Sequence, residues 1–196
     1  MSAPVYALVL AGGRSSRMHA DKAALAYHGR AQLIEAMRLV APLTARAFVS
    51  VRADQVSDTL RGGFAQIIDR RENLGPIAGI MAAQEEFPDV AWLVLACDLP
   101  FLSDAVLERL LAERDPSALA TAYRSAQDGL PEPLCAIWEP AAAAALDAYQ
   151  SGGGRCPRKF LIGHGARLLD PIDKHALDNV NTPEEYAQAR QALEGA

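Results

Sequence analysis

Short apolar runs alternate along the chain with longer segments that have the hydrophobic spacing of helices. The runs are partly β-branched and predict strands at residues 5–11, 47–51, 65–68, 92–96 and 119–123. The helical patterns cover residues 32–41, 77–87, 105–112 and 140–149. Strands and helices in alternation indicate βαβ units. The sequence therefore predicts an α/β fold of three layers, with a mainly parallel sheet between two layers of helices.

Two segments refine this picture. The stretch WLVLA at residues 92–96 is apolar at every position, which is typical of a central strand covered on both faces. Near the other end, Thr182, Pro183 and Glu185 form the pattern of a capping box, which opens a final helix to about Glu194. The 196 residues contain no internal repeat and no linker between domains, so we expect a single domain over residues 1–196.

The balance of charge limits the ligands that the chain can bind. A formal net charge of −5 argues against broad binding of nucleic acid or anionic membranes, so any anionic ligand must be met by local cations. No apolar run has the length of a membrane span, and the first residues lack a secretory signal. We therefore expect a cytoplasmic protein. Three cysteines without CxxC spacing indicate neither a disulfide framework nor a zinc site.

The stretch LAGGRSSRMHADK at residues 10–22 concentrates positive charge directly after the first predicted strand. Its cations are Arg14, Arg17 and Lys22. Gly12 and Gly13 let the main chain turn and expose its N–H groups, while the cations supply charge to a polyphosphate. The spacing matches neither a Walker A loop nor GxGxxG. Taken alone, the stretch fits either a phosphate-binding loop or a solvated turn between strand and helix.

Asp98 follows the buried strand WLVLA directly, so it is expected at the carboxyl end of a strand. Ligands gather at that edge of an open α/β sheet. An aspartate there can bind Mg²⁺, which prefers oxygen ligands and accompanies substrate phosphates. The alternative is a capping role ahead of the next helix, for which Ser103 is better placed.

Three motifs together resemble a known family. LAGGRSSRMHADK, CDLP at residues 97–100 and NVNTPEE at residues 179–185 are similar to those of GT-A-like nucleotidyltransferases, which have a Rossmann-like fold. They look most like the molybdenum cofactor guanylyltransferases, and the resemblance spans nearly the whole chain. It implies a nucleotide-binding half at about residues 1–100 and an acceptor-binding half at about residues 101–196.

The resemblance also implies roles for individual residues. The catalytic group would be Arg17, Lys22 and Asp98, with Asp98 binding Mg²⁺. The nucleotide would be bound by Leu10, Ala11, Gly12, Gly13, Arg14, Lys22, Arg52, Asp69, Gly75, Gly79 and Asp98. The matching NVN segment places Asn179 and Asn181 on the acceptor or metal side. Arg158 and Lys159 follow a glycine-rich loop, where they either meet the acceptor's phosphate or lie at a solvated helix end.

The chain departs from the family pattern at several positions. His19 stands where glycine is usual, and Arg52 lies about where a base-contacting asparagine is common, so guanine and cytosine both remain open. The stretches GLPEPL at residues 129–134 and CPRKF at residues 156–160 fit a subgroup of these proteins, which leaves the acceptor open as well.

The implied reaction is transfer of GMP from GTP to the phosphate of molybdopterin or molybdenum cofactor, with release of pyrophosphate. Other cofactor assembly proteins are candidate partners. The enzymatic alternatives are a cytidylyltransferase of the same cofactor and a nucleotidyltransferase for another small-molecule phosphate. The alternative outside enzymes is a catalytically silent nucleotide-binding module.

Overall fold

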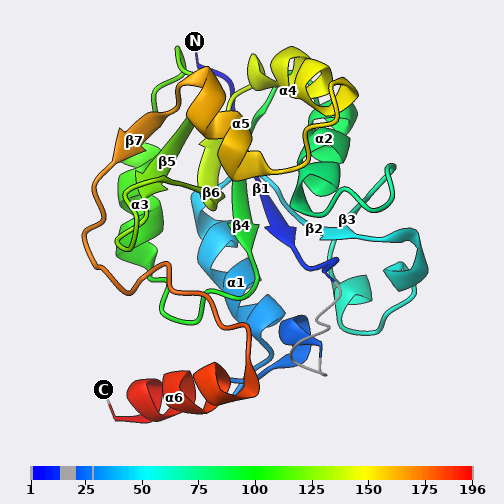
Figure 1. The fold of residues 1–196 in the computed structure, drawn as a ribbon. Helices are drawn as coiled ribbons and strands as arrows, with labels where there is room; N and C mark the ends of the chain where they lie inside the picture. Colours follow the sequence, from blue (N-terminus) through cyan, green and yellow to red (C-terminus); the bar gives the residue numbers. More distant parts are fainter. Residues whose placement is uncertain (1, 14–20, 28, 196) are drawn as a thin grey trace.

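The computed structural model describes residues 2–13, 21–27 and 29–195. Within these residues one seven-stranded sheet has the order β3-β2-β1-β4-β6-β5-β7 (Figure 1). The strands are β1 (Val5–Leu10), β2 (Ala47–Val51), β3 (Gln66–Ile68), β4 (Ala91–Ala96), β5 (Ala120–Arg124), β6 (Pro131–Trp138) and β7 (Arg167–Leu169). The α-helices are α1 (Gln32–Val40), α2 (Pro76–Glu86), α3 (Asp104–Ala112), α4 (Ala142–Ser151), α5 (Pro157–His164) and α6 (Pro183–Glu194). Short 3₁₀ helices are η1 (Lys22–Ala24), η2 (Ala41–Leu43), η3 (Ala53–Gln55) and η4 (Arg61–Gly63).

The sheet is mainly parallel, as the alternation of strands and helices predicts. β1 pairs in parallel with β2 and β4, and β2 pairs in parallel with β3. β6 runs antiparallel to both of its neighbours, β4 and β5. The carboxyl ends of β1, β2, β3 and β4 therefore lie along the same edge of the sheet.

Two layers of helices cover the sheet. Residues of α1 and α3 pack against one face in a single apolar cluster. Residues of α2, α4 and α5 pack against the other face in a second cluster. Between them, β4 is buried at each position from Ala91 to Leu95, which confirms that WLVLA is a central strand. These layers confirm the predicted three-layer architecture.

β6 is a strand that the hydrophobic pattern failed to predict. It begins at Pro131 and also contains Pro133, and proline usually disfavours an inner strand because it cannot donate to the ladder. The structure places Pro131 at the first position of the strand. Pro133 falls where the register with β5 shifts between Ala122 and Arg124. Both prolines thus occupy positions at which a strand tolerates them.

α5 and β7 were also missed. β7 has only three residues, too few to show a period. α5 has eight residues, begins with Pro157 and has no side-chain cap, so its start is marked weakly. The other predicted helices and strands are confirmed to within two residues at each end.

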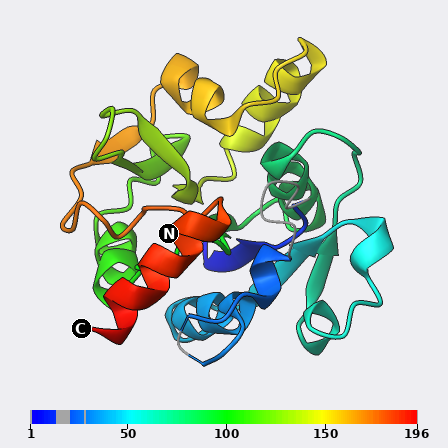
Figure 2. The same ribbon diagram turned by 60° about the horizontal axis from the view of Figure 1, so that its bottom comes forward.

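α6 lies outside the three layers, beyond the carboxyl edge of β1 and β4 (Figure 2). Its start is the predicted capping box, in which Thr182 accepts from the Glu185 amide and the Glu185 carboxylate accepts from the Thr182 amide. The rings of Tyr186 in α6 and Tyr27 meet edge to face, with centroids 5.0 Å apart. α6 is thereby held against the segment that follows η1.

In the described part of the chain, the helices are all too short or too polar to cross a membrane.

Candidate active site

A cavity of about 850 Å³ opens at the edge where the parallel strands end. Its lining includes each predicted nucleotide-binding residue that the structure describes. These are Leu10, Ala11, Gly12, Gly13, Lys22, Arg52, Asp69, Gly75, Gly79 and Asp98. Arg14, Arg17 and His19, which the sequence also singles out, lie outside the described residues. The fold therefore brings together residues that are as far apart in the sequence as Leu10 and Asp98.

Lys22 and Asp98 form the polar centre of this cavity. The Nζ of Lys22 donates to Oδ2 of Asp98 at 2.8 Å and to Oδ1 of Asn181 at 2.6 Å. Lys22 opens η1 after β1, whereas Asp98 follows β4, the neighbour of β1 in the sheet. Both side chains are mostly buried, so their charges interact with little screening by water. Asp98 is thus engaged by a cation rather than capping α3.

The C-terminal segment holds Asn181 in this cluster. The Val180 amide donates to the carbonyl oxygen of Asp98 at 3.2 Å. The Asn181 amide donates to Oε2 of Glu185, the acidic member of the capping box, at 2.6 Å. The structure therefore places the NVN segment against Asp98. The residues that follow this segment are held by the capping box of α6.

The donor set at this point suits a hard divalent cation. Oδ2 of Asp98 and Oδ1 of Asn181 both accept from Nζ of Lys22, so two oxygen atoms lie close together around the Lys22 ammonium group. No cluster of three or more histidine, cysteine, aspartate or glutamate side chains with metal-binding geometry occurs among the described residues. Mg²⁺ is commonly held by one or two carboxylates together with substrate phosphates and water. The residues present therefore fit Mg²⁺ bound jointly with a phosphate ligand.

Asp69 lies at another part of the same cavity, directly after β3. Its Oδ1 accepts a hydrogen bond from Oγ of Ser50 at 2.8 Å. Burial raises the pKa of the Asp69 carboxyl, while the Ser50 hydrogen bond and the charge of Arg52 oppose the shift. A half-buried acceptor in a ligand cavity is suited to accept from N–H donors, such as those on the edge of a nucleobase.

Arg52 lines the cavity, but its guanidinium is engaged by the protein. Nη1 donates to the carbonyl oxygen of Gly12, and Nε and Nη2 donate to the two carboxylate oxygens of Asp54 at 2.9 and 3.0 Å. Its backbone amide donates to Oε1 of Gln55 at 3.2 Å. Arg52 thus supports the main chain at Gly12, where the first strand leads into the predicted phosphate loop.

Gly79 sits where α2 approaches the ends of β1 and β2 most closely. A Cβ atom at this position would lie 2.4 Å from Oγ of Ser50 and 2.9 Å from Cδ2 of Leu10. Replacing Gly79 by Ala is expected to lower the free energy of unfolding by about 1–3 kcal/mol, because these neighbours must shift. Denaturant unfolding measures this change.

Gly163 is the matched control for this substitution, because it is also helical and a Cβ there would meet nothing within 4 Å. Replacing Gly163 by Ala should be neutral or stabilise the protein by up to about 1 kcal/mol. Equal effects of the two substitutions would contradict the close packing of α2 on the strand ends.

A second cavity of about 460 Å³ adjoins the first between the ends of β4 and β6 and the start of α5. The two cavities share Pro76, Ala96, Asp98 and Leu134. Arg158 and Asn179, both predicted to meet the acceptor, line the second cavity. The Arg158 guanidinium donates to carboxylate oxygens of Asp128 and Glu132 at 3.1 and 2.7 Å. Asp98 therefore stands at the boundary between two adjacent cavities.

The remaining predicted residues lie elsewhere. Lys159 is exposed on α5 and contributes to the lining of neither cavity. Asn181 contacts Lys22 without lining the cavities. Sequence reasoning also missed Arg61, a buried arginine that contacts Ala11, just after β1, and Asp21, the residue before Lys22. It opens the three-residue 3₁₀ helix η4, which is too short for hydrophobic periodicity to give a signal.

Comparison with known proteins gives consistent results. The sequence model of one protein family, the MobA-like NTP transferase domain, matches residues 7–168. A molybdenum cofactor guanylyltransferase of Pseudomonas aeruginosa is 33% identical over 192 residues, which cover 96% of either chain. A molybdenum cofactor biosynthesis bifunctional protein of Synechocystis is 36% identical over 94% of this chain, which spans about half (53%) of that relative's length.

Solved structures share the fold. The molybdopterin-guanine dinucleotide biosynthesis protein A of Archaeoglobus fulgidus superposes with a TM-score of 0.78 at 24% identity, covering 97% of this chain and all of that one (100%). A nucleotidyl transferase of Methanothermobacter superposes with a TM-score of 0.76 at 20% identity, and 98% of each chain is covered.

Proposed function

Because the chain belongs to the MobA-like NTP transferase family, we propose that it is a guanylyltransferase of the molybdenum cofactor. It transfers GMP from GTP to the phosphate of molybdopterin or molybdenum cofactor and releases pyrophosphate. The observation that carries this proposal is the meeting of two cavities at Asp98, where Lys22 is also placed. Two anionic substrates bound in these cavities would bring their phosphates together at one charged centre.

The same two cavities support our division of the chain into two halves. Apart from Leu134, the first cavity is lined by residues between Leu10 and Asp98. The second is lined largely by residues between Glu132 and Asn179. We assign nucleotide binding to about residues 1–100 and acceptor binding to about residues 101–196 on this basis.

The chemistry needs no nucleophilic side chain. A phosphate monoester has a second pKa of about 6 and is largely dianionic at neutral pH, so the acceptor's oxygen can attack the α-phosphorus of GTP directly. The protein must bring two anions together and stabilise charge on the leaving pyrophosphate. Lys22 supplies positive charge to the β- and γ-phosphates, and the main chain at Gly12 and Gly13 lines the same cavity.

Asp98, with Asn181 beside it, would hold Mg²⁺ in this reaction. When bound, the cation neutralises phosphate charge and helps to orient the two reactants. Arg158 and Asn179 line the second cavity, which we assign to the acceptor. Phosphate binding there must compete with the carboxylates of Asp128 and Glu132 for the Arg158 guanidinium.

The direct assay supplies molybdopterin, Mg²⁺ and one of ATP, GTP, CTP or UTP to the protein, and measures pyrophosphate together with the mass of the product. We expect pyrophosphate and a guanine dinucleotide with GTP. Turnover with CTP alone would identify a cytidylyltransferase. Turnover only with a different small-molecule phosphate would show that this compound, rather than molybdopterin, is the acceptor. Nucleotide binding without turnover under any condition would identify a silent nucleotide-binding module.

The family assignment also bears on the cellular setting. We propose that the protein works in the cytoplasm and receives its acceptor from other molybdenum cofactor assembly proteins. The support is that relatives covering most of this chain are named for molybdenum cofactor biosynthesis and guanylyl transfer.

Asp69 is the residue to which we assign recognition of the guanine base. Replacing Asp69 by Asn keeps an oxygen that can accept from Ser50 but removes a charged acceptor for the guanine N–H groups. We expect kcat/KM for GTP to fall about tenfold or more, since hydrogen bonds to charged groups contribute about 1.5–3 kcal/mol. Steady-state kinetics with GTP and CTP would measure the loss of preference. Asp89→Asn, at an exposed position before β4, is the charge-matched control.

The raised pKa of Asp69 also sets the sign of two further effects. Burial favours the protonated Asp69 carboxyl in the folded state, so protonation of Asp69 stabilises the fold at low pH. This stabilisation is lost as the pH rises through the raised pKa. Asp69→Asn should therefore unfold at the same or a higher temperature at neutral pH. In the wild type, GTP affinity should fall on acidification at a higher pH than an ordinary aspartate would give. A destabilised variant with unchanged GTP preference would contradict the assignment.

A further inference from the structure

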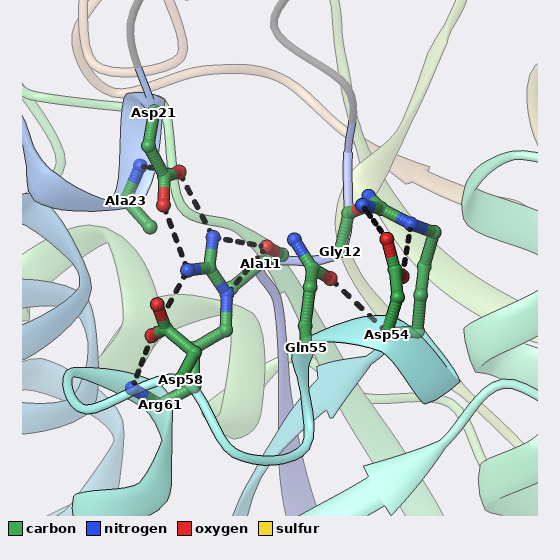
Figure 3. Close-up of polar contacts among 9 residues, drawn as sticks. Ala11, Gly12, Asp21, Ala23, Asp54, Gln55, Asp58 and Arg61 are labelled. Atoms are coloured by element: carbon green, nitrogen blue, oxygen red, sulfur yellow. Dashed lines mark hydrogen bonds and ion pairs between the residues drawn. The ribbon is translucent and has the colours of Figure 1, made fainter.

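Arg61 is a buried charged residue that contacts Ala11 and Asp21. It opens η4, and only 2% of its side chain is exposed. Its Nε and Nη2 donate to the carbonyl oxygen of Ala11 at 3.0 and 2.8 Å. Its Nη1 and Nη2 donate to the two carboxylate oxygens of Asp21 at 2.7 and 2.9 Å (Figure 3). The side chain thus binds both residues at once.

The remaining donor of the guanidinium is directed to its own loop. Nη1 also donates to Oδ1 of Asp58 at 3.2 Å, and the same oxygen accepts from the Arg61 amide at 2.9 Å. A guanidinium has five N–H donors, so its two bonds to Ala11, two to Asp21 and one to Asp58 use all of them. The hydrogen bonds that Arg61 donates to the Asp21 carboxylate raise the pKa of Arg61 above its ordinary value. Arg61 is therefore charged, and its donors are directed to the protein rather than to a ligand.

The two groups that Arg61 joins are the ends of one segment. Ala11 follows β1, and Asp21 precedes η1. Asp21 also caps η1, because its Oδ1 accepts from the Ala23 amide at 3.1 Å. Lys22 is the first residue of η1, so the position of its backbone relative to β1 depends on the contact between Asp21 and Arg61.

We propose that Arg61 is a positioning residue for binding of the nucleotide's phosphates: it fixes the separation of Ala11 and Asp21 and so places Lys22 beside Asp98. This inference rests on the proposed function only in that Lys22 contacts a triphosphate. Arg61 itself touches no substrate. A lysine cannot replace it, because an ammonium group lacks the planar fork that serves a carboxylate and a carbonyl oxygen together.

Arg114 provides a matched control. It is similarly buried, with 9% of its side chain exposed, and it donates to both oxygens of Glu139 at 2.6 and 2.7 Å. It also donates to the carbonyl oxygen of Ala3 at 2.8 Å, just before β1. Arg61 and Arg114 thus make the same kinds of bond at opposite ends of β1, and only Arg61 is linked to Lys22.

The experiment compares Arg61→Lys with Arg114→Lys in the full chain, using GTP as the probe without acceptor. Both variants should unfold at a lower temperature than the wild type. Only Arg61→Lys should raise the Kd for GTP, by about tenfold or more, because it displaces Lys22. It should also speed hydrogen exchange at the amides of residues 23–25, which Asp21 and Lys22 hold in η1.

A second variant keeps the test valid if Arg61→Lys does not fold. Asp21→Asn retains an acceptor for the Ala23 amide, but it presents an NH₂ group to the guanidinium, so it should have the same effects on Kd and exchange. Wild-type values in the folded variants, or an equal rise in Kd for Arg114→Lys, would overturn the proposal. If the wild type binds no GTP, the proposed function fails, and exchange at residues 23–25 alone decides the role of Arg61.

Discussion

Replacing Asp98 by Asn is expected to lower turnover by about 10³-fold while the fold is retained. Asparagine has nearly the same shape, but it lacks the charge that pairs with Lys22 and would hold Mg²⁺. Asp98 also lies on the boundary of both cavities, where the reacting phosphates would meet. The effect should therefore appear mainly in kcat. Pyrophosphate release under saturating substrates measures it, and circular dichroism verifies the fold.

Asp115→Asn is a suitable control for this substitution. Asp115 precedes β5, which begins at Ala120. Ala120 pairs with Trp138 of β6, and Trp138 pairs with Trp92, near the start of β4. This aspartate is therefore at the end of the sheet opposite Asp98. We expect Asp115→Asn to have wild-type turnover. Wild-type turnover of Asp98→Asn would show that the metal and the reacting phosphates are bound elsewhere.

Replacing Lys22 by Met should lower kcat/KM for GTP by about 10²-fold, because it removes the positive charge assigned to the β- and γ-phosphates. Methionine keeps most of the apolar stem, so packing around η1 should change little. The double variant with Asp98→Asn should lose much less than the product of the two single effects, since the side chains are in contact at 2.8 Å.

Lys174→Met, at an exposed position, is the control for removal of a lysine charge. It should have wild-type kinetics. A fall in kcat/KM for Lys22→Met no larger than that for Lys174→Met would contradict the phosphate role. Fully independent effects of Lys22→Met and Asp98→Asn would show that the two residues act at separate places.

The sequence predicts most of the fold because helices and inner strands leave periodic or continuous apolar patterns. WLVLA is buried as its composition indicates, and the Thr182 capping box marks the start of α6. β6 escapes prediction because its prolines are acceptable only in a particular register with β5, which no local pattern reveals. α5 escapes because it is short and lacks a side-chain cap.

The candidate site, like the fold, could be predicted from the sequence only in part. Gly12 and Asp98 stand just after β1 and β4, two recognisable strands, so the topology of the sheet brings them to one cavity, which Lys22 of η1 also lines. Arg61 carries no such signal. Its partners Asp21 and Ala11 are 40 and 50 residues away, and its burial depends on contacts that exist only in the folded chain. The contacts that join Ala11 to Asp21 are therefore visible in the structure alone.

The most direct test of the site is a crystal structure of the protein with GTP and Mg²⁺. We predict that the triphosphate lies in the first cavity, with Lys22 on its β- and γ-phosphates and the α-phosphate and metal at Asp98, facing the second cavity. A triphosphate bound away from Lys22 and Asp98, or an α-phosphate closed off from the second cavity, would contradict transfer of the nucleotide at this site.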